Sequence, residues 1–169
     1  MRDGFGRLSI EAVAAASGTG KPTIYRHWAN TQELAMEALI ADAPDPASPA
    51  PDLPPLEALT AQLERLVSAF GSTRGRQITQ ALASADPDSE FTRAFRNRVI
   101  LASREAGRAR IEHAVSLGQL RPPPDTDVLL DMIYGPLFFR LLAGHLPLDD
   151  GLARAIPATL MDLLGSSPD

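Results

Sequence analysis

Hydrophobic residues recur at spacings of three and four along most of this chain, which is the period of an amphipathic helix. The clearest series is Leu56, Leu59, Leu63, Leu66 and Phe70. The strict alternation of apolar and polar residues that is typical of strands is scarce, and Ala, Leu, Arg and Glu dominate instead. The pattern therefore predicts an all-α protein.

Two short helices are expected near the N-terminus. The stretch "SIEAVAAAS" has Ser9 as its N-cap, and Gly18 follows in the position that favours a left-handed residue. A second helix is expected to begin at Gly20 or Lys21 and to end near Trp28. Two short helices joined by a glycine-containing turn are therefore predicted.

A third helix, "TQELAMEALIAD", is expected to follow the cap residue Asn30 and to stop before Pro44. Six prolines between Pro44 and Pro55 cannot continue a helix. We therefore expect an N-terminal domain over residues 1–43, a Pro-rich linker over 44–55 and a C-terminal domain over 56–169.

The C-terminal domain is expected to hold a short helix over Arg76–Ala85 and a long one from Asp86 or Asp88 to about Leu117. Beyond it, "DVLLDMIYGPLFFRLLAGH" is hydrophobic all round the helix, and a final helix, "GLARAIPATLMDLLG", contains Pro157. This apolar surplus favours a homodimer that pairs these helices in a four-helix bundle. A buried central helix in a monomer is the alternative.

Composition narrows the function classes. The 169 residues are 44% hydrophobic and 22% charged and contain no cysteine, which excludes disulfides, thiolate catalysis and cysteine-ligated zinc. No apolar run reaches the roughly 18 residues of a membrane span, so a cytoplasmic protein is expected.

The net charge of −5 lies outside residues 1–41, where basic and acidic residues balance. Local binding of DNA by the N-terminal domain is therefore permitted.

The stretch "SGTGKPTIYRHWAN" contains a Gly-Lys pair that suggests a phosphate-binding loop. Such a loop needs G-x-x-x-x-G-K-[ST] between a strand and a helix. Here Ala15 stands at the first glycine, Pro22 stands at the hydroxyl position, and the preceding segment is helical. A nucleotide-binding enzyme is therefore disfavoured.

A helix-turn-helix fits the same stretch better. Lys21 can pair with phosphate, and Thr23 combines a hydroxyl with a methyl group that can contact thymine. Tyr25 and His27 offer hydrogen bonds to phosphate oxygens. From these residues alone, a solvated surface helix is the competing interpretation.

The segment "LSIEAVAAASGTGKPTIYRHWANTQELAMEAL" resembles the DNA-binding head of the tetracycline-repressor (TetR) family of bacterial transcription regulators. The matching positions are Ser9, Val13-Ala14, Gly18, Lys21, Thr23 to Trp28, and Leu34. The resemblance implies that Ser9 binds phosphate at a helix N-terminus. It also implies that Lys21, Pro22 and Thr23 lie in the major groove and that Tyr25 and His27 hold the backbone.

Some positions depart from the family pattern. Thr19 replaces an apolar turn residue, Gly20 replaces a capping Ser, and Thr31 stands where a phosphate-contacting Lys is common. The family also begins with a helix that packs across the helix-turn-helix, whereas this chain opens just before Gly4-Phe5. Either the chain is truncated or the protein lacks that first helix.

The resemblance further implies a C-terminal domain that binds a small molecule and forms dimers through its last two helices. An effector pocket is expected among the helices that carry Leu66, Phe70, Phe95, Val99 and Met132, although each of these could simply pack a core. The residues expected at the dimer interface are Leu137, Phe138, Leu141, Leu142, Leu160 and Leu163.

The sequence shows no paired carboxylates, nucleophile-base set or metal-ligand spacing, so no catalysis, cofactor or metal is expected. We expect a homodimeric regulator, a repressor that a small, largely apolar effector releases from a double-stranded DNA operator. The alternative is a helical homodimeric interaction protein whose head does not bind DNA.

Overall fold

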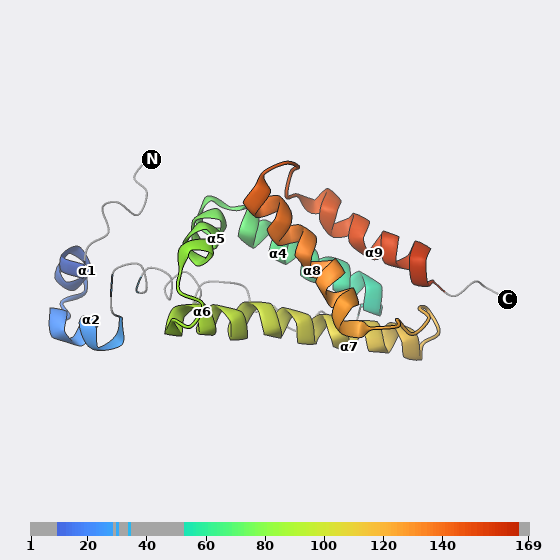
Figure 1. Ribbon diagram of the computed structural model, residues 1–169, viewed down its shortest axis with the longest axis horizontal. Coiled ribbons are helices and arrows are strands. Elements are labelled where there is room, and N and C mark those ends of the chain that lie inside the picture. The colour runs from blue at the N-terminus through green and yellow to red at the C-terminus, as the bar shows by residue number, and fades with distance from the viewer. Residues whose placement is uncertain (1–9, 29, 31–33, 35–52, 166–169) are drawn as a thin grey trace. The chain divides into compact units, whose positions relative to one another are not determined.

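The computed structural model describes residues 10–28, 30, 34 and 53–165, and the chain divides into two compact units, Met1–Ala43 and Pro44–Asp169 (Figure 1). The described residues form helices joined by short connections and include no strand. The predicted all-α class is therefore confirmed.

In the first unit, α1 (Ile10–Ser17) contacts α2 (Lys21–His27). Gly18 joins them with a φ of +68°, the left-handed region that glycine adopts without steric cost. Ile10 and Ile24 are both buried, so one isoleucine from each helix forms the small core. The predicted two-helix hairpin is confirmed over these residues, while most of the expected third helix lies outside the described ones.

The second unit is built around α4 (Pro55–Gly71), which contacts α5 (Thr73–Ser84), α7 (Ala102–Ser116), α8 (Thr126–Ala143) and α9 (Asp150–Leu164) (Figure 1). The leucines of the predicted amphipathic series explain this central position. Leu59 and Leu63 have no exposed surface, and Leu66 and Phe70 are buried beside them. The apolar stripe of α4 therefore supplies the centre of the core.

Two helix starts differ from the prediction. α5 begins at Thr73 rather than Arg76, because the Ser72 hydroxyl accepts a hydrogen bond from the Gly75 amide at 2.9 Å. The next helix, α6 (Glu90–Phe95), is capped by Ser89 rather than by Asp86 or Asp88. Asp86 instead accepts from the Asp88 amide at 2.9 Å and so closes a turn.

The long helix continues from α6 through a π-helical segment, η2 (Arg96–Leu101), into α7. It ends at Ser116, with Leu117 as its C-cap, and Gly118 follows with a φ of +70°. A π-helical turn is rare and is frequently found at functional sites. Its presence could not be read from the apolar spacing.

A buried polar cluster joins α4, α7 and α8. Gln62 has no exposed surface, and its Nε2 donates to the Ser103 carbonyl oxygen at 3.0 Å. The Tyr134 hydroxyl donates to the same oxygen at 2.7 Å and lies 3.1 Å from Oε1 of Gln62. Arg110 donates to that Oε1 at 3.0 Å. The side chains of three helices are thus bound to one another inside the core.

Gly107 makes this cluster possible, because a Cβ atom there would collide with the Tyr134 hydroxyl and lie 3.1 Å from two atoms of its ring. The Gly107→Ala variant must therefore displace Tyr134 from the cluster. We expect a loss of about 1–3 kcal/mol in the free energy of unfolding, measured by urea denaturation.

Gly135→Ala is the matched control in α8, since a Cβ atom at Gly135 would meet nothing within 4 Å. It should stabilise the protein by up to about 1 kcal/mol through higher helix propensity. If both variants changed stability in the same direction and by the same amount, the proposed role of Gly107 would be wrong.

Candidate nucleic-acid interface and cavity

Helix α2 presents most of the expected DNA-binding side chains to solvent. Lys21, Pro22, Thr23, Tyr25 and His27 are all exposed, although Tyr25 is a large aromatic residue with 53% of its surface accessible. Each of the pairs Lys21–Tyr25 and Thr23–His27 is separated by one helical turn. Ser9, the other expected phosphate ligand, lies outside the described residues.

Lys21 is held at the start of α2 by an ion pair, in which its Nζ lies 3.0 Å from Oε1 of Glu11 on α1. Both side chains are more than half exposed, so the pair contributes little to stability. It does link the first residue of α2 to α1.

The remaining residues of the hairpin support this surface. Ile24 is buried, whereas Val13 and Trp28 are half-buried. The Trp28 ring lies 5.5 Å from the ring of His27, measured between centroids. These contacts fix the end of α2 next to the exposed His27 imidazole.

A cavity of about 260 Å³ lies among α4, η2, α7 and α8 in the second unit. Of the five residues expected at an effector pocket, Leu66, Phe70 and Val99 line it. Phe95 does not line it but packs against Phe70, with ring centroids 6.3 Å apart. The prediction for Met132 is corrected, because this side chain is 56% exposed and is not among the residues that line the cavity.

The cavity also has polar lining residues that the sequence analysis missed, namely Ser103, Arg104, Asp131 and Tyr134. The five residues expected at this pocket are all apolar. No sequence signal identifies these four, because they come from two helices whose facing surfaces are set only by packing. The π-helical segment η2 lies just before Ser103, but a π-helical turn can be recognised only in the structure and not in the sequence.

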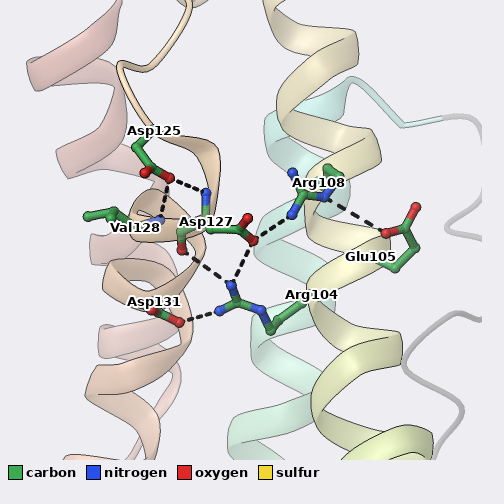
Figure 2. A network of polar contacts seen from close by, with 7 residues as sticks. All are labelled: Arg104, Glu105, Arg108, Asp125, Asp127, Val128 and Asp131. Atoms are coloured by element: carbon green, nitrogen blue, oxygen red, sulfur yellow. Dashed lines mark hydrogen bonds and ion pairs between the residues drawn. The ribbon is translucent and has the colours of Figure 1, made fainter.

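A network of arginines and aspartates connects α7 and α8 beside the cavity (Figure 2). Nη2 of Arg104 and Nη2 of Arg108 lie 3.0 Å and 2.6 Å from Oδ1 of Asp127, and Arg104 also pairs with Asp131. The Arg108 and Arg104 guanidinium groups hold the pKa of Asp127 below its ordinary value. Asp125 caps α8 next to them by accepting from the Asp127 and Val128 amides.

Burial raises the pKa of Tyr134 to about 12, so its hydroxyl remains protonated at physiological pH. Burial is also the main effect on Arg110, whose pKa it lowers while the nearby Tyr134 raises it. The Tyr134 hydroxyl therefore keeps its proton, and its hydrogen bond to the Ser103 carbonyl oxygen, at physiological pH.

The residues expected at a dimer interface do not share one surface. The prediction is corrected for Leu137 and Leu160, because both are buried in the core of their own chain. Phe138 lines the cavity and Leu141 is half-buried. Leu142 and Leu163 are exposed, at 57% and 55%.

In the part of the chain that the structure describes, no helix is long and apolar enough to cross a membrane. The same residues include no cluster of three His, Asp or Glu side chains that could hold a metal ion.

The hairpin geometry defines a helix-turn-helix protein, and comparison with known proteins gives its family. Residues 54–160 match the family described as tetracyclin repressor-like, C-terminal domain, and residues 1–38 match the bacterial regulatory proteins of the tetR family. The chain belongs to the TetR family of transcriptional regulators. The resemblance noted in the sequence is therefore confirmed.

Individual relatives are similar over most of their length. The HTH-type transcriptional regulator YdeS of Bacillus subtilis is 26% identical over 155 residues, which are 91% of this chain and 78% of that protein. A DNA-binding transcriptional repressor TetR of Mycobacteroides abscessus is 29% identical, over 97% and 87%. The crystal structure of the TetR family transcription regulator SCO0332 superposes with a TM-score of 0.74 at 30% identity, over 96% and 89%.

Family membership settles the class of activity. TetR-family regulators are DNA-binding transcription factors without catalytic activity, and this chain is a DNA-binding regulator and not an enzyme.

The Arg–Asp network gives a testable dependence on pH. The pKa of Asp127 is lowered in the folded state from its ordinary 3.8, so its stabilising effect is present above about pH 4 and is lost as the pH falls through the folded pKa. We therefore expect Asp127→Asn to lower the thermal unfolding midpoint at pH 7. The difference from the wild type should shrink steadily as the pH falls below about 4.

Asp162→Asn on α9 serves as the control, since Asp162 is an exposed carboxylate outside the network. It should show no pH-dependent loss of this kind. A difference between wild type and Asp127→Asn that is the same at pH 3 and pH 7 would contradict the role given to the Asp127 charge.

Proposed function

We propose that this protein is a cytoplasmic, homodimeric repressor that a small, largely apolar molecule releases from its DNA operator. The observation that carries the proposal is the presence, in separate units of one chain, of an exposed helix-turn-helix surface and an apolar cavity. Linkage between two such sites requires only that the effector bind one arrangement of the protein more tightly than the other.

The DNA surface consists of Lys21, Thr23, Tyr25 and His27 on α2. The groups differ in what they can contact: an ammonium group for phosphate, a hydroxyl and methyl for a base edge, and two polar ring groups for the backbone. The name of the Mycobacteroides abscessus relative describes that protein as a DNA-binding transcriptional repressor, which supports repression here. We place the operator contacts on this face of α2.

The proposed dimer uses a face of α8 that differs from the expected one. Val128, Met132, Phe139 and Leu142 are each more than half exposed, and their spacings of four, seven and three residues put them on one side of the helix. The buried residues Leu130, Ile133 and Leu137 lie on the opposite side. A second copy of the chain would remove this apolar stripe from water.

DNA from beside the protein's own gene tests the first part of the proposal. Lys21→Ala and Tyr25→Phe should each weaken binding by about 1 kcal/mol or more per subunit, about fivefold or more in Kd, because each removes a phosphate contact. Lys21→Ala should also reduce the dependence of log Kd on log salt by about one per subunit. Fluorescence anisotropy at several salt concentrations measures both effects.

Arg154→Ala is the matched control, because Arg154 is an exposed cation in an ion pair with Glu64, with the paired atoms 3.2 Å apart, in the other unit. It removes the same charge and should leave DNA binding unchanged. Unchanged affinity in both head variants would overturn the site assignment. No binding by the wild-type chain would favour the interaction-protein alternative.

The dimer is tested by Phe139→Glu, which puts a charge into the middle of the exposed α8 stripe. Light scattering coupled to size-exclusion chromatography should show a dimer for the wild type and a shift of at least tenfold in the concentration of half-dissociation for the variant, since a buried unpaired charge costs at least about 1.4 kcal/mol. Leu117→Glu, at a similarly exposed leucine that follows α7, should remain a dimer. Equal effects of the two variants would contradict the proposed interface.

A further inference from the structure

The exposure of the lining residues shows where the cavity opens. Six of them are buried and form its floor and walls: Leu66, Phe70, Val99, Ser103, Tyr134 and Leu137. Asp131 and Gly135, one helical turn apart on α8, are exposed instead. Arg104 of α7 is paired with Asp131, and Ile100 lies four residues before Arg104 on the same long helix. The mouth of the cavity therefore lies between α8 and the continuous helix of η2 and α7.

Gly135 leaves this mouth open. A Cβ atom there would meet nothing within 4 Å, so no described side chain closes the space beside this residue. One turn earlier on α8, the ion pair between Arg104 and Asp131 bridges α7 and α8 (Figure 2). The open part of the mouth is thus next to Gly135, where α8 contributes no side chain of its own.

Gly135 also lies in the middle of the exposed apolar stripe on α8. The large residues of that stripe are Val128, Met132, Phe139 and Leu142, and none of them lines the cavity. With Gly135 included, the spacings along the stripe are four, three, four and three residues, which keeps all five positions on one side of the helix. The mouth of the cavity and the apolar stripe therefore meet at Gly135.

A second copy of the chain is the partner that fits this surface. Alternating spacings of four and three form the seam by which helices pair in coiled coils and bundles, and in a twofold interface the same stripe meets itself. The charges beside the stripe allow such a contact, because Arg104 and Arg108 are paired with Asp127 and Asp131 within each copy. Two copies can therefore meet here without bringing unpaired like charges together.

We propose that a second copy of the chain closes the mouth of the cavity, so that each effector site is completed by the α8 stripe of the partner. This inference rests on the proposed function, which supplies both the dimer and the effector site. An effector in the cavity of a single chain would remain in contact with water beside Gly135. Covering that opening links two equilibria: the dimer binds the effector more tightly than the single chain does, and the effector in return stabilises the dimer.

Naphthalene is the probe for this linkage, because an apolar cavity of about 150 Å³ accepts benzene and this one measures about 260 Å³. We expect the wild-type dimer to bind naphthalene at least about fivefold more tightly than the single chain, since covering about 40 Å² of apolar surface is enough for that ratio. Titrations that follow naphthalene fluorescence, at protein concentrations above and below half-dissociation of the dimer, measure the two affinities.

Two variants separate the contribution of the partner from that of the chain itself. Phe139→Glu and Leu142→Glu each place a charge in the stripe, yet neither residue lines the cavity of its own chain. Leu142 is seven residues from Gly135, about 10 Å along the helix, so its replacement does not alter the mouth directly. Both variants should dissociate and should lose naphthalene affinity by the same factor of about five or more. Leu117→Glu should remain a dimer and bind naphthalene as the wild type does.

The reciprocal effect is measured on the wild type, without any substitution. Saturating naphthalene should lower the concentration of half-dissociation about 25-fold or more, because each of the two sites in the dimer contributes about fivefold. Light scattering over a series of dilutions, with and without naphthalene, gives this ratio.

The outcomes separate this inference from the proposed function. If the wild-type dimer and the two dissociated variants bound naphthalene equally, and naphthalene left the dissociation of the dimer unchanged, the partner would not close the cavity, although the dimer and the effector site would both stand. A wild type that remains a single chain at every concentration would reject the proposed dimer and this inference with it. A dimer that binds no naphthalene would reject the effector site, and again this inference with it.

Discussion

The second unit depends on a buried polar contact among three helices. Gln62 of α4 is completely enclosed, and its amide group, the Tyr134 hydroxyl and the Ser103 carbonyl oxygen are mutually hydrogen-bonded between α4, α8 and α7. Polar groups buried this deeply are tolerated only when they are paired, and pairing requires that all three helices keep one relative position. Gly107 permits that position by leaving room for the tyrosine. The register of α7 against α8 follows from this requirement.

The cavity is a consequence of the same arrangement. The polar cluster holds α7 and α8 together at its floor, and the Arg104, Arg108, Asp127 and Asp131 network joins the same two helices beside it (Figure 2). Between these two connections the walls are apolar, and the chain does not fill the space completely. Interiors are normally packed without voids of this size, so the retained cavity is a feature that function has to explain.

The first unit works under a different constraint, because its described core contains little more than Ile10 and Ile24. So small a core supplies little stability by itself, and the hairpin relies on local devices: Gly18 in the left-handed conformation and Pro22 at the start of α2. The exposed Lys21, Thr23, Tyr25 and His27 can then be spared from packing. Exposed side chains that the core does not need are available for binding.

The sequence alone determined the helical class, the hairpin around Gly18 and the family, because these depend on local spacing, turn chemistry and a short motif. It also identified three residues of the cavity, since Leu66, Phe70 and Val99 are apolar and belong to facing helices. It could not place Met132 or Leu137, because α8 is hydrophobic all round and its pattern does not say which face is buried. Nor could it find the part played by Ser103, whose carbonyl oxygen accepts hydrogen bonds from Gln62 and Tyr134 only when α4, α7 and α8 pack together. Tertiary structure decided those points, because hydrogen bonds and cavities between helices depend on distances that no local pattern encodes.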